Sequence, residues 1–187
     1  STEGLRSEVS VERGVGQLTV NWTDIPQAKS YNIYKNDRMI QNVVGDTSYV
    51  DIVAPGVPTS YFVRSIDLYD LEGPESNVVT EKASFPPPDL SISVVAGGYT
   101  VEGSGRLINL SWPEVPGVTK YALYRDGELL TKQSELQYEE KDLDWNTTYV
   151  YGINSIDADD IEGVNFVDSV TTHPKVSTPV FKLEGKV

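Results

Sequence analysis

The sequence has 187 residues and contains no cysteine, one histidine and one methionine. Without cysteine the chain can form no disulfide, no thiolate metal site and no cysteine nucleophile. Its single imidazole, His173, directly precedes Pro174, so we expect neither a catalytic triad nor a metal site built on paired histidines. No apolar run approaches the ~18 residues of a membrane helix, and no charged-then-apolar leader is present. We therefore expect a soluble internal fragment or mature protein without a membrane partner.

Basic residues are also scarce. The chain has 15 Lys and Arg residues against 28 Asp and Glu residues, which gives a net charge of −13. Proteins bind phosphate backbones through clustered Lys and Arg, and the sequence has no such cluster, so we predict no nucleic-acid partner. The surplus of carboxylates fits a soluble surface, a cation-binding surface, or both.

An internal duplication organises the chain. The segment LTVNWTDIP around Trp22 returns as INLSWPEVP around Trp112, 90 positions later. The segment SIDLYDLEG, which begins at Ser65, returns as SIDADDIEG from Ser155, again 90 positions later. One constant spacing over separate blocks indicates a duplicated module, and a unit of this length that occurs only twice favours tandem domains over a solenoid.

Each copy has the pattern of a β-protein. Apolar residues alternate with polar ones up to Trp22 and up to Trp112, which places both indoles on the buried face of a strand. Asp126-Gly127 predicts a tight hairpin, and Asn36-Asp37 occupies the same place in the first copy with a weaker signal. No stretch shows a sustained helical period. About seven short strands in ~90–100 residues predict a Greek-key, immunoglobulin-like β-sandwich for each copy.

The predicted organisation is modular. Module 1 covers residues 1–82, a proline-rich linker covers 83–88, module 2 covers 89–172, and a connector covers 173–187. Three consecutive prolines in the linker favour stiff polyproline II, and we expect Phe85 to pack in the seam between the modules. The C-terminal segment resembles the start of another connector, and both ends look cut from a longer chain, so we expect a multimodular parent.

These motifs resemble fibronectin type III modules over nearly the whole chain. The resemblance rests on the strand tryptophan, on the Y-x-I-Y-K or Y-x-L-Y-R strand that follows it, and on the late T-x-Y-x-Y-x-I block. In the second copy, Tyr149 follows Leu143 by six residues, as in the tyrosine corner of that family, whereas the first copy has Thr59 instead. The resemblance implies that Trp22, Trp112 and Tyr149 are core residues.

A finer resemblance concerns the kind of protein in which such modules occur. The phrases YRDGELL, TSYVD and SIDADDIEG are similar to modules of bacterial extracellular polysaccharide-degrading enzymes, where such pairs stand between catalytic and cellulose-binding modules in clostridial cellobiohydrolases. This implies an extracellular, monomeric, non-catalytic fragment of a glycoside hydrolase, with neighbouring modules of the same polypeptide as its partners. A fold of this size also has no cleft in which two carboxylates could perform glycoside hydrolysis.

The acidic loops of the repeated S-I-D-x-x-D-[LI]-E-G frame are candidate Ca²⁺ sites. Closely spaced carboxylates at a sharp turn can supply the oxygen ligands that Ca²⁺ needs. The alternative is turn formation, in which Asp side chains accept hydrogen bonds from nearby amides. No cofactor is required on either reading. The candidate ligands are Asp67, Asp70, Glu72, Asp157, Asp159, Asp160 and Glu162.

Loop aromatics are candidate sugar-binding residues, because their apolar faces can stack on sugar rings. Trp145 is the main candidate, and Tyr69 and Tyr99 also fall in predicted loops. Trp145 could instead cover one end of the sandwich. Two functions therefore stay open: a structural spacer between modules of a secreted enzyme, and an accessory module that binds polysaccharide, such as cellulose, or a protein.

Overall fold

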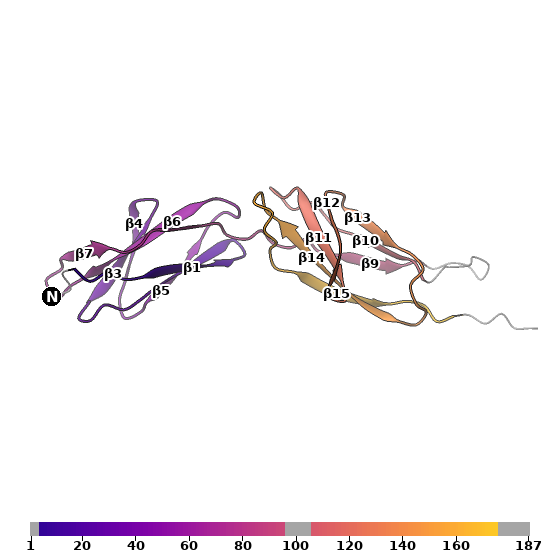
Figure 1. Ribbon diagram of the computed structural model, residues 1–187, viewed down its shortest axis with the longest axis horizontal. Helices are drawn as coiled ribbons and strands as arrows, with labels where there is room; N and C mark the ends of the chain where they lie inside the picture. The colour runs from indigo at the N-terminus through magenta and orange to yellow at the C-terminus, as the bar shows by residue number, and fades with distance from the viewer. Residues whose placement is uncertain (1–3, 96–105, 176–187) are drawn as a thin grey trace, which may run out of the picture. The chain divides into compact units, whose positions relative to one another are not determined.

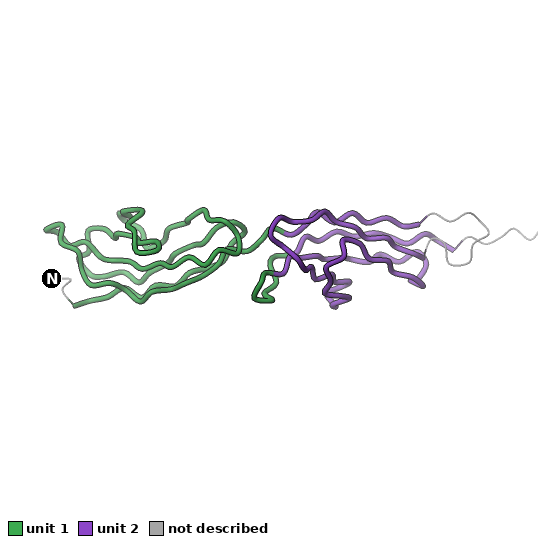
Figure 2. The backbone as a smooth tube through the Cα atoms, turned by 90° about the horizontal axis from the view of Figure 1, so that it is seen from above, with its two compact units in different colours: residues 1–86, 157–164 green, residues 87–156, 165–187 purple. Residues whose placement is uncertain are grey.

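The computed structural model describes residues 4–95 and 106–175, and the chain divides into two compact units (Figures 1 and 2). The first unit comprises the chain up to Pro86 together with the segment Asp157–Val164, and the second comprises the remainder. The described ranges contain fifteen strands and no helix, and hence no helix of the length and apolarity needed to cross a membrane. The protein is all-β, as predicted.

The first unit is a sandwich of two antiparallel sheets. One sheet has the order β1-β2-β5, and the other has the order β4-β3-β6-β7, with β8 also paired to β6. The chain crosses from one sheet to the other after β2, after β4 and after β5, as in a Greek key. The strands are β1 (Val9–Gly14), β2 (Gln17–Trp22), β3 (Ser30–Lys35), β4 (Arg38–Val43), β5 (Ser48–Ile52), β6 (Thr59–Ile66), β7 (Glu72–Glu75) and β8 (Val79–Glu81).

The second unit repeats this topology. Its sheets have the orders β13-β10-β9 and β12-β11-β14-β15, so each strand has a counterpart at the same place in the first unit. The strands are β9 (Ser91–Val94), β10 (Ile108–Ser111), β11 (Lys120–Arg125), β12 (Glu128–Gln133), β13 (Gln137–Glu140), β14 (Thr148–Ile156) and β15 (Phe166–Thr171).

The two tight hairpins have the same geometry despite their different sequences. Asn36 and Asp37 between β3 and β4 have φ of 47° and 64°, and Asp126 and Gly127 between β11 and β12 have φ of 49° and 84°. Positive φ at both central residues matches the right-handed twist of the flanking strands. The Asn36 side chain also accepts the amide hydrogen of Ser60 at 3.0 Å, so the turn is bonded to β6.

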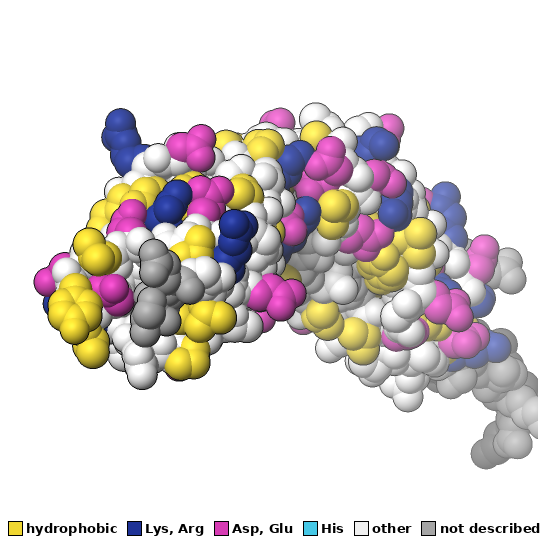
Figure 3. Space-filling model, turned by 60° about the vertical axis from the view of Figure 1, so that its left-hand side comes forward, with side chains coloured by type: hydrophobic (Ala, Val, Ile, Leu, Met, Phe, Trp, Pro, Cys, Tyr) yellow, Lys and Arg dark blue, Asp and Glu magenta, His cyan; other side chains and the backbone are white. Residues whose placement is uncertain are grey.

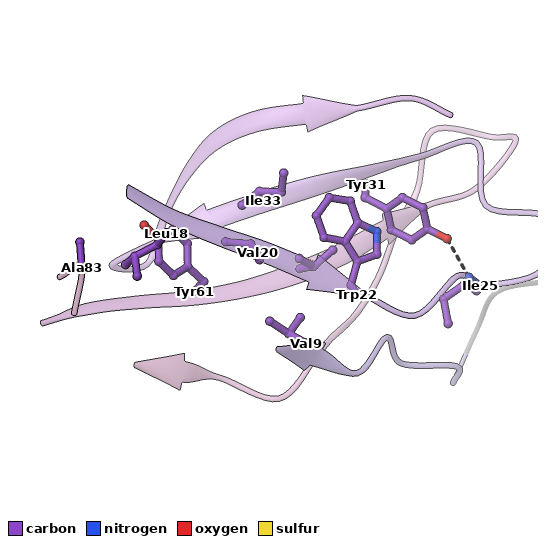
Figure 4. Close-up of a cluster of buried hydrophobic side chains, with 10 residues drawn as sticks. Val9, Leu18, Val20, Trp22, Ile25, Tyr31, Ile33, Tyr61 and Ala83 are labelled. Atoms are coloured by element: carbon purple, nitrogen blue, oxygen red, sulfur yellow. Dashed lines mark hydrogen bonds between the residues drawn. The ribbon is translucent and has the colours of Figure 1, made fainter. Parts of the chain in front are cut away.

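The core of the first unit lies between its two sheets and contains the residues of the predicted apolar alternation (Figure 4). The rings of Trp22 and Tyr31 pack at a centroid distance of 5.6 Å, and Trp112 and Tyr121 pack at 6.0 Å in the second unit. Other large buried residues of the two cores are Ile33, Tyr61, Val63, Leu123, Tyr149, Tyr151 and Ile153.

The segment after β8 belongs to the first unit and is not free linker. The Ser84 amide donates to the Gly14 carbonyl at 3.0 Å, and the Ser84 carbonyl accepts the Gly16 amide hydrogen at 3.1 Å. Phe85 lies against Gly56, so closely that a Cβ added there would be 2.7 Å from the ring. The units therefore divide between Pro86 and Pro87, within the predicted linker 83–88, and Phe85 packs on its own module.

Candidate functional site

The acidic loop between β6 and β7 is organised around Asp67. Its Oδ1 accepts the amide hydrogens of Tyr69 at 2.8 Å and Leu71 at 3.0 Å. The Asp67 amide donates to the Leu71 carbonyl at 3.0 Å, and the Asp70 amide donates to the Asp67 carbonyl at 3.2 Å. One carboxylate oxygen thus holds two amides of a closed five-residue turn, which is the turn-forming role that Asp has in loops.

The other two carboxylates of this loop point to different partners. Asp70 Oδ1 lies 2.5 Å from the Lys29 ammonium. Glu72 Oε1 accepts hydrogen bonds from Asn32 at 2.6 Å and from the Tyr34 hydroxyl at 2.7 Å. Partial burial raises the pKa of Glu72, but these hydrogen bonds and the nearby Arg64 charge together lower the pKa below its usual value.

The second copy of the frame has the same turn. Asp157 Oδ1 accepts the amide hydrogens of Asp159 and Ile161, both at 2.9 Å, and the Asp160 amide donates to the Asp157 carbonyl at 3.0 Å. Asp160 has φ of 62°, which matches φ of 64° at Asp70. The duplicated sequence therefore encodes a duplicated turn.

Two carboxylates of the segment Asp157–Val164 are paired with cations of the first unit. Arg13 Nη1 lies 3.4 Å from Asp157 Oδ2, and Lys82 Nζ donates to Asp159 Oδ2. The Lys82 hydrogen bond and charge hold the pKa of Asp159 below its usual value. Glu162 is half-buried.

The predicted ligands therefore do not converge on a common point. Within residues 4–95 and 106–175, no group of three or more His, Asp or Glu side chains is arranged to hold a metal ion. The loop geometry favours the turn-forming alternative, and Ca²⁺ binding stays a prediction for a melting experiment.

A buried carboxylate between a tyrosine and a cation occurs in each unit, and the sequence did not predict it. In the first unit, Asp51 Oδ2 accepts the Tyr61 hydroxyl hydrogen at 2.5 Å and lies 2.7 Å from Lys35 Nζ. Burial, followed by the hydrogen bond to Asp51, raises the pKa of Tyr61 above its usual range. The protonated tyrosine satisfies the carboxylate as a hydrogen-bond donor, and the Lys35 ammonium compensates its charge.

The second unit repeats this set with longer side chains. Glu140 Oε2 accepts the Tyr151 hydroxyl hydrogen at 2.5 Å, and Arg125 Nη1 donates to Glu140 Oε1. Burial and then the hydrogen bond to Glu140 raise the pKa of Tyr151. Lys35 and Arg125 occupy equivalent positions 90 residues apart, and so do Tyr61 and Tyr151. This spacing was the signal in the sequence from which the repeated cation and tyrosine could have been found.

Trp145, the predicted sugar-binding residue, is half-buried and covered by a cation. The Arg106 guanidinium carbon lies 5.7 Å from the ring centroid. The same guanidinium donates to the carbonyl oxygens of Leu143 and Asp142, the latter at 2.9 Å. A sugar could stack on this side of the indole only after Arg106 had moved.

The corner contact of Tyr149 is present. Its hydroxyl oxygen accepts the Asp144 amide hydrogen at 3.0 Å, which closes the loop before β14. At the matching position of the first unit, the Thr59 hydroxyl donates to the Val57 carbonyl at 3.2 Å instead. His173 is exposed, and its carbonyl accepts the Asn146 amide hydrogen at 2.9 Å. Tyr99 lies outside the described residues.

Comparison with known proteins gives a likeness of fold. No protein-family model and no curated protein matches the sequence. Among solved structures, the fibronectin(III)-like modules of Clostridium thermocellum CbhA match 89% of this chain and 94% of their own, at 14% identity and a TM-score of 0.41. The FN1–FN3 domains of chicken CNTN1 match 90% of this chain and 67% of theirs, at 17% identity and a TM-score of 0.41.

A third similar structure is the central fibronectin-III array of RIM-binding protein, which matches 92% of this chain and 70% of its own length, at 12% identity and a TM-score of 0.38. Likenesses this distant concern the fold alone. The strand orders of both units describe a tandem pair of antiparallel β-sandwiches with one topology.

Proposed function

We propose that this chain is a non-catalytic pair of spacer modules that positions neighbouring modules of a secreted polysaccharide-degrading enzyme. The observation that carries the proposal is the attachment of the connecting segment. Ser84 and Phe85 are bound to the first unit by backbone hydrogen bonds and by ring packing, so the chain first leaves that unit after Pro86. The connection between the units then begins with prolines, whose fixed φ restricts the backbone.

The internal use of polar groups supports a non-catalytic role. The acids at Asp67 and Asp157 close turns, and the acids at Asp51 and Glu140 neutralise cations inside each sandwich. A general acid or base needs a position within hydrogen-bond reach of a substrate proton. The carboxylates of both sets are instead directed at groups of their own fold.

The setting in a polysaccharide-degrading enzyme is supported by the resemblance of the repeated phrases to modules of such enzymes. The chain supplies no catalytic set of its own in its described parts, so the proposal assigns the chemistry to other modules. The value of the pair to such an enzyme would be a fixed distance between the modules on either side.

A distance measurement tests the spacer role. The chain has no cysteine, so single cysteines at the exposed positions Arg38 and Ser134 can carry spin labels without side reactions. Double electron–electron resonance should give a narrow distance distribution for the native linker. A control with a Gly-Ser insertion between Pro86 and Pro87 should give a broad one.

Equally broad distributions for the two proteins would contradict the spacer role, because a freely jointed pair cannot set a distance. The catalytic part has its own test: incubation with cellulose, xylan and mannan should release no reducing sugar. Turnover by the purified chain would overturn the assignment of chemistry to other modules.

A further inference from the structure

The first unit has an open polar hollow of about 390 Å³ at the end where β2, β4 and β6 finish. Figure 3 looks toward this end of the unit, where hydrophobic, acidic and basic side chains are interspersed. The hollow lies between the loop after β2 and the loop after β4. The residues that line it include Asp24, Ala28, Lys29, Tyr31, Asp46 and Thr47.

The lining combines acceptors and donors that are already oriented. The Tyr31 hydroxyl donates to Asp24 Oδ1 at 2.5 Å and accepts the Ile25 amide hydrogen at 2.7 Å. Asp46 Oδ1 accepts the Thr47 amide hydrogen at 2.7 Å. Asp24 is thus held by the Tyr31 hydroxyl of β3, and Asp46 is held by the amide of the residue that follows it. Such fixed side chains are what a preformed polar site requires.

The charges of the lining select against charged ligands. Two carboxylates, Asp24 and Asp46, would repel an anion, and within the described residues no three carboxylates converge to hold a metal cation. Neutral hydroxyl groups suit both kinds of side chain, since a hydroxyl donates to a carboxylate and accepts from an ammonium. A neutral polyhydroxylated ligand is therefore the best chemical match.

The β6–β7 loop, which contacts the lining residue Lys29, exposes apolar side chains. Lys29 is paired with Asp70 at 2.5 Å, which holds the β6–β7 loop beside the hollow. That loop exposes 84% of Tyr69, 70% of Leu68 and 63% of Leu71. An exposed aromatic ring next to oriented polar groups can stack on the C–H face of a sugar.

The second unit lacks this combination, although its fold is the same. Thr47 and Leu136 are equivalent, because their carbonyls accept the amide hydrogens of the two strand tryptophans, each at 3.0 Å. At the positions of Ala28 and Thr47, the second unit has the larger apolar residues Val118 and Leu136, and at the position of Tyr69 it has an aspartate. Val118 is buried, so it occupies space that the smaller Ala28 leaves open.

We propose that this hollow binds one hexose or pentose residue of a neutral saccharide. In this site Asp24 and Asp46 accept hydrogen bonds from the sugar hydroxyls, Lys29 donates to them, and Tyr69 stacks on the ring. The site is a binding site only, and it gives the first unit a role beyond that of a spacer.

Titration of the intact chain with cellopentaose, xylopentaose and mannopentaose, followed by amide NMR, tests the proposal. We expect at least one of them to produce saturable shifts at Gly45, Thr47 and Tyr69. Replacing the lining by the residues of the second unit, with Ala28→Val and Thr47→Leu, should weaken binding at least tenfold. Ile52→Ala, which truncates a residue at the opposite end of β5, is the matched control and should leave the affinity unchanged.

Two further variants keep the test decisive if the protein with Ala28→Val and Thr47→Leu does not fold. Asp46→Asn keeps an acceptor for the Thr47 amide and removes the charge, and Tyr69→Ala removes the stacking ring on an exposed loop. Each should weaken binding at least threefold. No saturable shifts with any of the three saccharides, binding that survives all three of these variants, or tighter binding of glucuronate or glucosamine oligomers would overturn the proposal.

Discussion

Replacing Gly56 with alanine should destabilise the first unit through two separable effects. Gly56 has φ of +73°, and an L-residue in the left-handed region costs about 1–2 kcal/mol. The new Cβ would also lie 2.7 Å from Cζ and 2.8 Å from Cε2 of Phe85. Overpacking of this kind costs about 1–3 kcal/mol. We therefore expect the free energy of unfolding of the first unit to fall by about 2–5 kcal/mol in all.

Gly45 supplies a matched control in the same unit. Its φ is +74°, but a Cβ added there meets nothing within 4 Å. Gly45→Ala should therefore lower the unfolding free energy by the backbone contribution alone, about 1–2 kcal/mol. Adding Phe85→Ala to Gly56→Ala removes the clash, so the double variant should lose less stability than the two single losses added together.

The assay is calorimetry combined with urea unfolding. Two units give two transitions that must be fitted separately, and Trp22→Phe identifies the transition of the first unit. About 1 kcal/mol shifts the melting temperature of a domain of this size by about 4–8 °C, so the variants are easily ranked. Equal losses for Gly45→Ala and Gly56→Ala, or no relief from Phe85→Ala, would refute the packing of Phe85 on Gly56.

Three other outcomes are expected. Tyr149→Phe should cost the second unit about 0.5–1.5 kcal/mol in urea unfolding, because the Asp144 amide loses its acceptor; an unchanged midpoint would deny the corner bond a stabilising role. Glu72 has a lowered pKa, so it stabilises the fold above its unfolded-state pKa, and that contribution is lost as pH falls through its folded-state pKa. The loss of stability on acidification should be smaller in Glu72→Gln than in Glu75→Gln, and equal losses would count against this role. If the acidic loops bind Ca²⁺, excess calcium should raise the melting temperature relative to chelator, and Asp157→Ala should abolish the rise; superimposed wild-type curves would leave the acids as turn formers.

Local patterns in the sequence were sufficient for the fold. The alternation that ends at Trp22 and at Trp112 reports burial directly, because side chains in a strand alternate between two faces. Residue type alone predicts the turn at Asn36-Asp37 less well. These two non-glycine residues have positive φ, as Asp126 and Gly127 do, although their residue types are the weaker hairpin signal.

Contacts between distant segments could not be predicted in the same way. Asp51 and Glu140 are 89 positions apart, one fewer than the repeat, so the duplication does not align these two acids. The place of Phe85 depends on Gly56, which lies in another loop, whereas the proline-rich context suggested that Phe85 packs in the seam between the modules. The polar hollow depends on separate loops that meet only in the folded sandwich.

The attachment of Ser84 has a mechanical consequence. Its backbone hydrogen bonds to Gly14 and Gly16, together with the parallel bridges from Val15 to Ser84 and from Pro55 to Ala83, lie where the chain leaves the first unit. Tension applied through Pro86 would load these bonds and the Phe85 packing before it reached β8. Hydrogen bonds between two segments that run parallel to each other are loaded together. If the segment were instead peeled from its end, the same bonds would break one at a time. A pair of modules under pulling force would therefore hold at this short segment until its bonds broke together.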